Sequence, residues 1–155
     1  MTPAIKLLKK QKIQYIVHEY NHDSSTESYG EEAAQKMGVD ANRVFKTLVV
    51  RSDKSLAVGI VPVTAKLSLK SFAKALGVKK VAMAEPKDVE NTTGYILGGV
   101  SPIGQKKRLE TVIDKSAFVY DSIFVSAGKR GLEVELSPKD LQKILGAKEA
   151  QIADS

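Results

Sequence analysis

Hydrophobic residues recur along the chain with two different spacings, which predict helices in some segments and strands in others. Segments whose apolar positions lie three and four residues apart, and which start at Ser, Thr or Pro and stop at Gly, are typical of helices. Such helices are expected at residues 3–11, 31–37, 69–76 and 138–145, with a further short one from Pro86. Segments with alternating apolar residues or clustered β-branched residues are typical of strands. Strands are expected at residues 13–20, 44–50, 56–63, 81–84, 109–114, 122–125 and 132–136.

The order of these segments predicts an α+β fold in a single domain that spans residues 1–155. The strands at 44–50 and 56–63 are separated only by the polar stretch Ser52–Ser55, which favours a hairpin. Strands and helices do not alternate strictly, which disfavours a doubly wound parallel sheet. We therefore expect a mixed, strongly curved and partly barrel-like sheet of six to seven strands, with four to five helices at its periphery.

Length and composition are those of an ordinary globular domain. The chain has 155 residues, of which 43% are apolar, and it has no cysteine. The absence of cysteine excludes disulfides, thiolate-bound metals and a thiol nucleophile supplied by the protein. No apolar run reaches the roughly 18 residues that cross a membrane, and the start of the chain lacks the apolar core of a signal peptide. The sequence therefore predicts a cytoplasmic protein with no membrane partner.

Charge points to an anionic partner. The chain has 24 Lys and Arg against 18 Asp and Glu, a formal charge of +6 at pH 7. Such an excess favours nucleic acid first, and a nucleotide or a membrane surface second. The basic residues gather in four short runs: Lys9–Lys12, Lys79–Lys80, Lys106–Arg108 and Lys129–Arg130.

The most unusual stretch is Thr92–Gly104, in which four glycines and a proline interrupt the regular patterning. Because glycine lacks Cβ, the pair Gly98 and Gly99 would allow a loop to bring its backbone amides close to a ligand. A plain turn between two strands is the alternative interpretation. A phosphate-binding loop of the NTPase type is disfavoured because Gln105 stands where that loop needs lysine.

Two further motifs have a functional and a structural interpretation. His18–His22 matches the H-E-x-x-H pattern of zinc hydrolases, but that pattern needs a helix and this segment alternates like a strand. A chance match is favoured, and zinc hydrolysis through His18 and His22 stays an alternative. Lys46 stands inside an apolar strand, so its ammonium faces either a pocket or solvent. Ser126 has no visible partners for a catalytic triad and belongs equally to a hairpin tip.

Three segments together resemble the YbaK family of aminoacyl-tRNA deacylases, which includes the editing domain of bacterial prolyl-tRNA synthetases. The segments are residues 45–48, 93–108 and 125–132, and the resemblance extends from the first residues to the last helix. Within the family, the chain is most similar to the free-standing deacylases that act on Cys-tRNA(Pro).

This resemblance implies trans-editing of mischarged Cys-tRNA(Pro), with Cys-tRNA(Cys) as a second candidate substrate. In the mechanism ascribed to the family, the thiol of the substrate's cysteine attacks its own ester. The enzyme is then a lyase in form if a thiolactone leaves, and otherwise a hydrolase. Such a reaction needs orientation and oxyanion stabilisation but no metal and no cofactor. The implied partners are the acceptor 3′ end of tRNA and prolyl-tRNA synthetase. A non-catalytic module that binds the acceptor end is the alternative.

The family pattern also implies roles for individual residues. Lys46 would anchor the 3′ end of the tRNA, and Gly98 and Gly99 would present backbone to the aminoacyl group. Residues implied to line or support the substrate site are Tyr20, Thr47, Ser126 and Glu133, the last standing where the family has an aspartate. Residues expected to meet phosphates are Lys106, Lys107, Arg108, Lys129 and Arg130.

Overall fold

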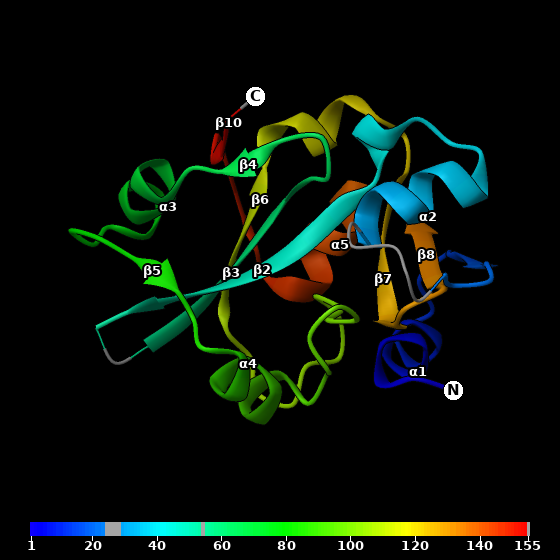
Figure 1. Ribbon diagram of the computed structural model, residues 1–155, viewed down its shortest axis with the longest axis horizontal. Helices are drawn as coiled ribbons and strands as arrows, with labels where there is room; N and C mark the ends of the chain where they lie inside the picture. The colour runs from blue at the N-terminus through cyan, green and yellow to red at the C-terminus, as the bar shows by residue number, and fades with distance from the viewer. Residues whose placement is uncertain (24–28, 54, 155) are drawn as a thin grey trace.

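The computed structural model describes residues 1–23, 29–53 and 55–154, which form a mixed α and β domain (Figure 1). Its helices are α1 (Pro3–Lys10), α2 (Tyr29–Met37), α3 (Leu69–Leu76), α4 (Pro86–Thr93) and α5 (Pro138–Leu145), with short 3-10 turns η1 (Ala41–Arg43) and η2 (Lys115–Val119). Its strands are β1 (Ile16–Glu19), β2 (Phe45–Ser52), β3 (Ser55–Pro62), β4 (Lys66–Leu67), β5 (Ala82–Met83), β6 (Glu110–Asp114), β7 (Ile123–Lys129), β8 (Leu132–Leu136), β9 (Lys148–Ala150) and β10 (Ala153–Asp154). The polar stretches expected at 21–25 and 52–55 lie partly outside the described residues.

The helix ends confirm the expectations drawn from their capping residues. The side chains of Thr2, Ser68 and Ser137 each accept a hydrogen bond from a backbone N–H in the first turn of α1, α3 and α5. Gly77 and Gly146 adopt left-handed conformations just after α3 and α5, with φ of 75° and 62°. These boundaries were predictable because each is set by residues within one helical turn.

The strands of the described residues form three sheets, so the expected single sheet of six to seven strands is wrong. The strand orders are β1-β8-β7, β10-β4 and β5-β2-β3-β6-β9. The hairpin of β2 and β3 is confirmed, but β3 pairs parallel to β6, and β6 pairs parallel to β9. Within the described residues the pairing does not close on itself, so the partly barrel-like form is not confirmed.

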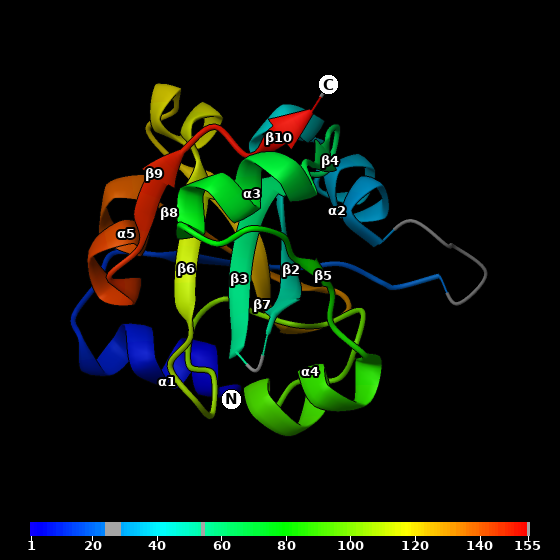
Figure 2. The ribbon, with the colours of Figure 1, turned by 90° about the vertical axis from the view of Figure 1, so that its left-hand side faces the viewer.

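The middle strands of the five-stranded sheet, β3 and β6, are largely buried on both faces, whereas β5 and β9 at its edges are mostly exposed. Its strands run side by side through the middle of the molecule (Figure 2). On one face, Phe72 of α3 packs with Val50, Val61 and Val112. The ring of Phe72 lies where a Cβ on Gly59 would stand, 2.8 Å from its nearest atom, so glycine at 59 is what lets α3 approach β3.

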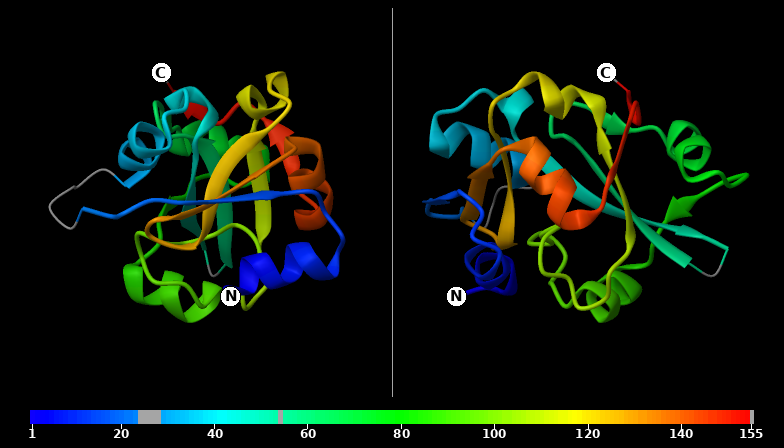
Figure 3. Two further views of the ribbon diagram at one scale, coloured as in Figure 1. Left: turned by 90° about the vertical axis from the view of Figure 1, so that its right-hand side faces the viewer. Right: turned by 180° about the vertical axis from the view of Figure 1, so that it is seen from behind.

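The opposite face packs against the three-stranded sheet and α1 and α5. The shared core includes Leu8 of α1, Ile60 of β3, Val125 of β7 and Leu141 of α5. Figure 3 shows α1 below β7 and β8 in one view, and α5 between β7 and β6 from behind. In the part of the chain that the structure describes, no helix combines the length and apolarity needed to cross a bilayer.

Candidate active site

A cavity of about 370 Å³ opens beside β2, along the edge of that strand that faces away from β3. On one side β5 pairs with β2 only at Val50 and Arg51, and Ala84 donates its amide to Val49 at 3.0 Å. At the other end, Val44, just before β2, forms an isolated bridge with Phe124 of β7. The cavity fills the gap between these two contacts. Its lining residues are Tyr20, Gly30, Val44, Phe45, Lys46, Thr47, Leu48, Val49, Val63, Met83, Ala84, Pro86, Val89, Leu97, Gly98, Val100, Ser126, Lys129, Arg130 and Glu133.

Thr47 stands at the middle of this gap and turns polar atoms toward it. The carbonyl of Val44 accepts the Val63 amide of the chain after β3, whereas the carbonyl of Val49 accepts from Ala84 on the other side. Because backbone groups alternate between the two sides of a strand, those of Thr47 point the same way as those of Val49, toward the open edge. The Thr47 side-chain hydroxyl is buried and has no hydrogen-bond partner among the described residues. A buried hydroxyl without a partner is costly, which makes Thr47 a candidate ligand-binding residue.

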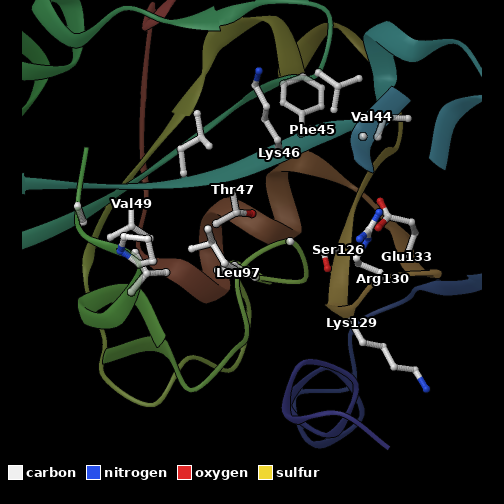
Figure 4. Close-up of a pocket in the computed structure, with 18 of the residues that line it drawn as sticks. Val44, Phe45, Lys46, Thr47, Val49, Leu97, Ser126, Lys129, Arg130 and Glu133 are labelled. Carbon is white, nitrogen blue, oxygen red and sulfur yellow. The ribbon is translucent and has the colours of Figure 1, made fainter. Parts of the chain in front are cut away.

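Lys46 projects from the other face of β2, away from Thr47 in Figure 4, and is one of the residues that line the cavity. Leu48 and Val50 share this face of the strand and pack in the core there. Burial lowers the pKa of Lys46, while Glu31 raises it and Lys66 lowers it further. Lys46 is partly buried and lines the cavity, and its role in binding stays a prediction.

The opposite wall comes from β7, β8 and the end of β1. Ser126 of β7 and Glu133 of β8 are cross-strand partners, and Tyr20 follows β1 with its amide bonded to the Gly131 carbonyl at 3.0 Å. Glu133 is only 7% exposed, and this burial raises its pKa to about 8. Burial also raises the pKa of Tyr20, with the charge of Glu133 adding to the effect. Glu133 is therefore mostly neutral at pH 7.

Ser126 is tied into the hairpin and has no triad around it. Its hydroxyl accepts the Gly128 amide at 3.1 Å, inside a β-bulge between Ser126 and Lys129. Neither histidine lines the cavity. The bulge turns Ser126 toward the cavity, which fits a binding role better than a nucleophilic one.

The adjacent residues Gly98 and Gly99 have different positions relative to the cavity. Gly98 lines the cavity with φ of 93°, at the third position of a turn in which the Gly99 amide donates to the Ile96 carbonyl at 2.9 Å. This conformation favours glycine. Gly99 does not line the cavity. A Cβ at Gly99 would stand 2.8 Å from the Cα of Lys129, so Gly99 lets the loop lie directly against the hairpin.

The loop that carries Gly98 is held in place by a hydrogen bond within the loop and by a contact with α1. The hydroxyl of Tyr95 is buried and donates to the Ile103 carbonyl at 2.6 Å, and Gly104 lies against the carbonyl of Pro3. The loop connects α4 to β6, so the alternative of a turn between two strands is wrong.

The mouth of the cavity has one apolar side and one basic side. Met83 and Leu97 line it and are 47% and 50% exposed, and the neighbouring Ile96 is 76% exposed. Across from them stand Lys129 and Arg130 at the tip of the β7–β8 hairpin. An apolar side facing a basic side suits a ligand that has both flat apolar and anionic parts.

Comparison with known proteins identifies the family. A family model described as the aminoacyl-tRNA editing domain matches residues 23–144. The chain belongs to this family. It is 40% identical over 152 residues to EbsC of Enterococcus faecalis, named as a candidate Cys-tRNA(Pro)/Cys-tRNA(Cys) deacylase, covering 97% of this chain and 92% of that protein.

Two solved structures share the fold of this editing domain. One is the hypothetical protein APE2540, with a TM-score of 0.88 and 24% identity over 98% of this chain and 99% of that one. The other is described as a candidate trans-editing enzyme for prolyl tRNA synthetase, with a TM-score of 0.83 and 24% identity over 98% of this chain and 93% of that one.

The editing domain does not bring all the expected residues together. The run Lys106–Arg108 stays outside the cavity, although Lys129 and Arg130 reach it. Lys107 and Arg108 line a separate hollow together with Asp53, Asp88 and Glu110. The guanidinium of Arg108 also lies where a Cβ on Gly146 would stand, at the end of α5. The mixed charge of this hollow weakens the expectation that the run meets phosphates.

The zinc alternative finds no support in the geometry of the editing domain. His18 Nε2 lies 2.9 Å from Glu135 Oε1, and His22 Nδ1 lies 2.7 Å from Glu32 Oε1, so the two rings face different carboxylates. His18 lies in β1, not in a helix. Within residues 1–23, 29–53 and 55–154, no group of three or more possible metal ligands gathers.

The sequence analysis did not predict the apolar wall of the cavity. Met83, Leu97, Pro86 and Val89 come from β5, α4 and the start of the glycine loop. One signal was available, because Ile96 and Leu97 are large apolar residues inside a loop rich in glycine.

Proposed function

We propose that this editing domain removes cysteine from mischarged Cys-tRNA(Pro) in trans, with Cys-tRNA(Cys) as a second substrate. The observation that carries the proposal is the convergence of Lys46, Thr47 and Gly98 on one cavity in a chain that has no cysteine of its own. Support also comes from family membership and from the name of the Enterococcus faecalis relative. The cavity volume lies within the range of roughly 300–1,000 Å³ typical of small-ligand sites.

In the proposed reaction the substrate supplies the nucleophile. The cysteine sulfur forms a bond to its own ester carbonyl carbon, and the bond from that carbon to the ribose oxygen breaks. The thiol proton ends on the ribose oxygen, so a cyclic thiolactone and intact tRNA result, without an oxidant or a reductant. The protein then needs only to hold the reacting atoms together and to stabilise the charge on the carbonyl oxygen.

The cavity residues that were expected at the site have the following roles in this proposal. Lys46 anchors the 3′-terminal nucleotide by its charge, and the Gly98 backbone meets the ester. The unpaired Thr47 hydroxyl hydrogen-bonds the aminoacyl group, and Tyr20 and Ser126 line its far side. Because burial keeps Glu133 mostly neutral at pH 7, this carboxyl does not repel the RNA and can donate a hydrogen bond.

Turnover of precharged Cys-tRNA(Pro) by catalytic amounts of protein tests the proposal. We expect the Lys46→Ala variant to lose about a hundredfold or more in kcat/KM while it stays folded, because a charged anchor in a partly buried site is lost. Lys66→Ala is the matched control. Lys66 is close enough to lower the pKa of Lys46 but lies outside the cavity, so this variant should keep its activity.

The same assay distinguishes the remaining alternatives. A non-catalytic module for the acceptor end would protect the ester instead of cleaving it. Ser-tRNA(Pro) replaces the thiol by a hydroxyl of similar size, so it should be spared if the substrate's sulfur is the nucleophile. Wild-type rates with Lys46→Ala, or equal rates on the seryl and cysteinyl esters, would contradict the proposed site or the proposed mechanism, respectively.

A further inference from the structure

The outward face of α1 carries a stripe of lysines. Lys6, Lys9 and Lys10 lie at positions i, i+3 and i+4 of the helix, and Lys12 follows its end. All four are exposed, whereas Ala4 and Leu8 on the opposite side are fully buried. The helix is therefore held by its apolar side and presents its charge to the outside.

This positive charge is not offset by neighbouring acids. The first acidic residue in the chain is Glu19, so residues 1–18 carry four lysines and no carboxylate side chain. Within the described residues, none of these lysines takes part in an ion pair. The basic run at Lys107 and Arg108 differs, because three acids share its hollow. Uncompensated charge on one surface is what attracts a polyanion.

The stripe is joined to the mouth of the cavity. The Thr2 cap of α1 lies 3.3 Å from where a Cβ on Gly128 would stand, next to Lys129 at the hairpin tip. Figure 4 shows the Lys129 side chain leaving the cavity residues on the side where α1 lies. From Thr2 to Lys9, α1 extends the basic surface by about 10 Å, at 1.5 Å per residue. The N-terminal end of α1 therefore lies beside the hairpin tip that carries Lys129, and Lys6 and Lys9 follow along the helix.

We propose that α1 and Lys129 bind the phosphate backbone of the tRNA acceptor stem, beyond the single-stranded 3′ end that enters the cavity. This inference rests on the proposed function for the identity of the RNA. It assigns the duplex contact to α1 and not to the run Lys106–Arg108. The contact is with phosphates, so it contributes affinity and salt dependence without reading sequence.

The test compares two double variants on two substrates. Lys9→Gln with Lys10→Gln removes two charges from the stripe, and Lys70→Gln with Lys74→Gln removes two equally exposed charges from α3. The substrates are full-length Cys-tRNA(Pro) and cysteine esterified to a CCA trinucleotide, which lacks the stem. Deacylation and the binding of uncharged tRNA(Pro) are measured between about 50 and 200 mM salt.

For the α1 variant we expect the KM for full-length substrate to rise about five- to tenfold at low salt. The slope of the logarithm of its tRNA affinity against the logarithm of the salt concentration should become less steep by about two, roughly one for each lost phosphate contact. The trinucleotide ester should react as with wild type, and the α3 variant should behave as wild type on both substrates.

The results that would overturn the role of α1 differ from those that would overturn the proposed function. An unchanged KM and salt slope in the α1 variant, or an equal loss on the trinucleotide, would overturn the role of α1 while deacylation still stands. A loss confined to assays that contain prolyl-tRNA synthetase would make α1 a protein-docking surface instead, which also overturns it. If wild type cleaves neither substrate, the proposed function fails, and the binding of uncharged tRNA still decides whether α1 contacts RNA.

Discussion

Replacing Glu133 by Gln should make the stability of the protein much less sensitive to pH. Glu133 is 7% exposed, and burial raises its pKa from 4.5 to about 8. In the unfolded chain the carboxyl loses its proton near pH 4.5, whereas in the folded chain it keeps the proton until about pH 8. The folded state therefore binds more protons in this interval, and raising the pH favours unfolding. Glutamine has the shape of the neutral carboxyl and does not titrate.

The size of the effect follows from these two pKa values. Each tenfold difference in proton affinity is about 1.4 kcal/mol, so the interval from 4.5 to about 8 corresponds to between 4 and 5 kcal/mol, as an order of magnitude. Between pH 5 and pH 8 the part that can be observed is roughly 3 kcal/mol. Wild type should lose this much stability relative to Glu133→Gln as the pH rises, and nearly all of the loss should occur above pH 5.

Urea unfolding of both proteins at a series of pH values between 5 and 8 measures the difference. Every other ionisable group is the same in both proteins, so contributions from those groups cancel in the comparison. If the stability curves of the two proteins run parallel, Glu133 is ionised in the folded state, and the argument from burial is refuted. In that case a cation in the cavity would have to compensate the carboxylate.

Two further substitutions probe the walls of the cavity. Thr47→Val removes the buried hydroxyl that has no partner, so we expect the free energy of unfolding to rise by about 1 kcal/mol. We also expect kcat/KM to fall about tenfold, and unchanged activity would contradict a ligand role for Thr47. Gly99→Ala places a Cβ 2.8 Å from the Lys129 backbone, so the free energy of unfolding measured by thermal denaturation should fall by roughly 1–3 kcal/mol. The KM should rise because the hairpin must move. Gly99 has no positive φ, so the steric contact is the expected cause of the loss, and unchanged stability and KM in this variant would contradict the argument.

The parts of the fold that the sequence predicted well are those determined by near neighbours. The ends of α3 and α5 follow from Ser68, Gly77, Ser137 and Gly146, which act within one turn. The β2–β3 hairpin follows from two apolar runs around a short polar stretch. The parallel pairing of β6 with β3 and β9 was not predictable, because partners far apart in the chain leave no local pattern. The division into separate sheets was missed for the same reason.

The candidate site shows the same limit. Motif resemblance picked out Lys46, Thr47 and Gly98, and the fold brings them to one cavity. It also grouped Gly99 with Gly98, although Gly98 lines the cavity and Gly99 lies against the hairpin. Adjacent residues share a motif but not a direction, and only the backbone conformation tells them apart.

The bridge between Val44 and Phe124 has a consequence for how amino acid selectivity could change. The cavity walls belong to two different sheets, and this bridge joins the chain just before β2 to β7 by backbone pairing. Phe124 is held there by His18 on one side, at 5.3 Å between ring centroids, and by the guanidinium of Arg43, 5.0 Å from its centroid. Phe124 therefore helps to set the spacing between the two walls, although it does not line the cavity. Substitutions around Phe124 would change which ligands fit the chamber, with every residue that lines it left intact.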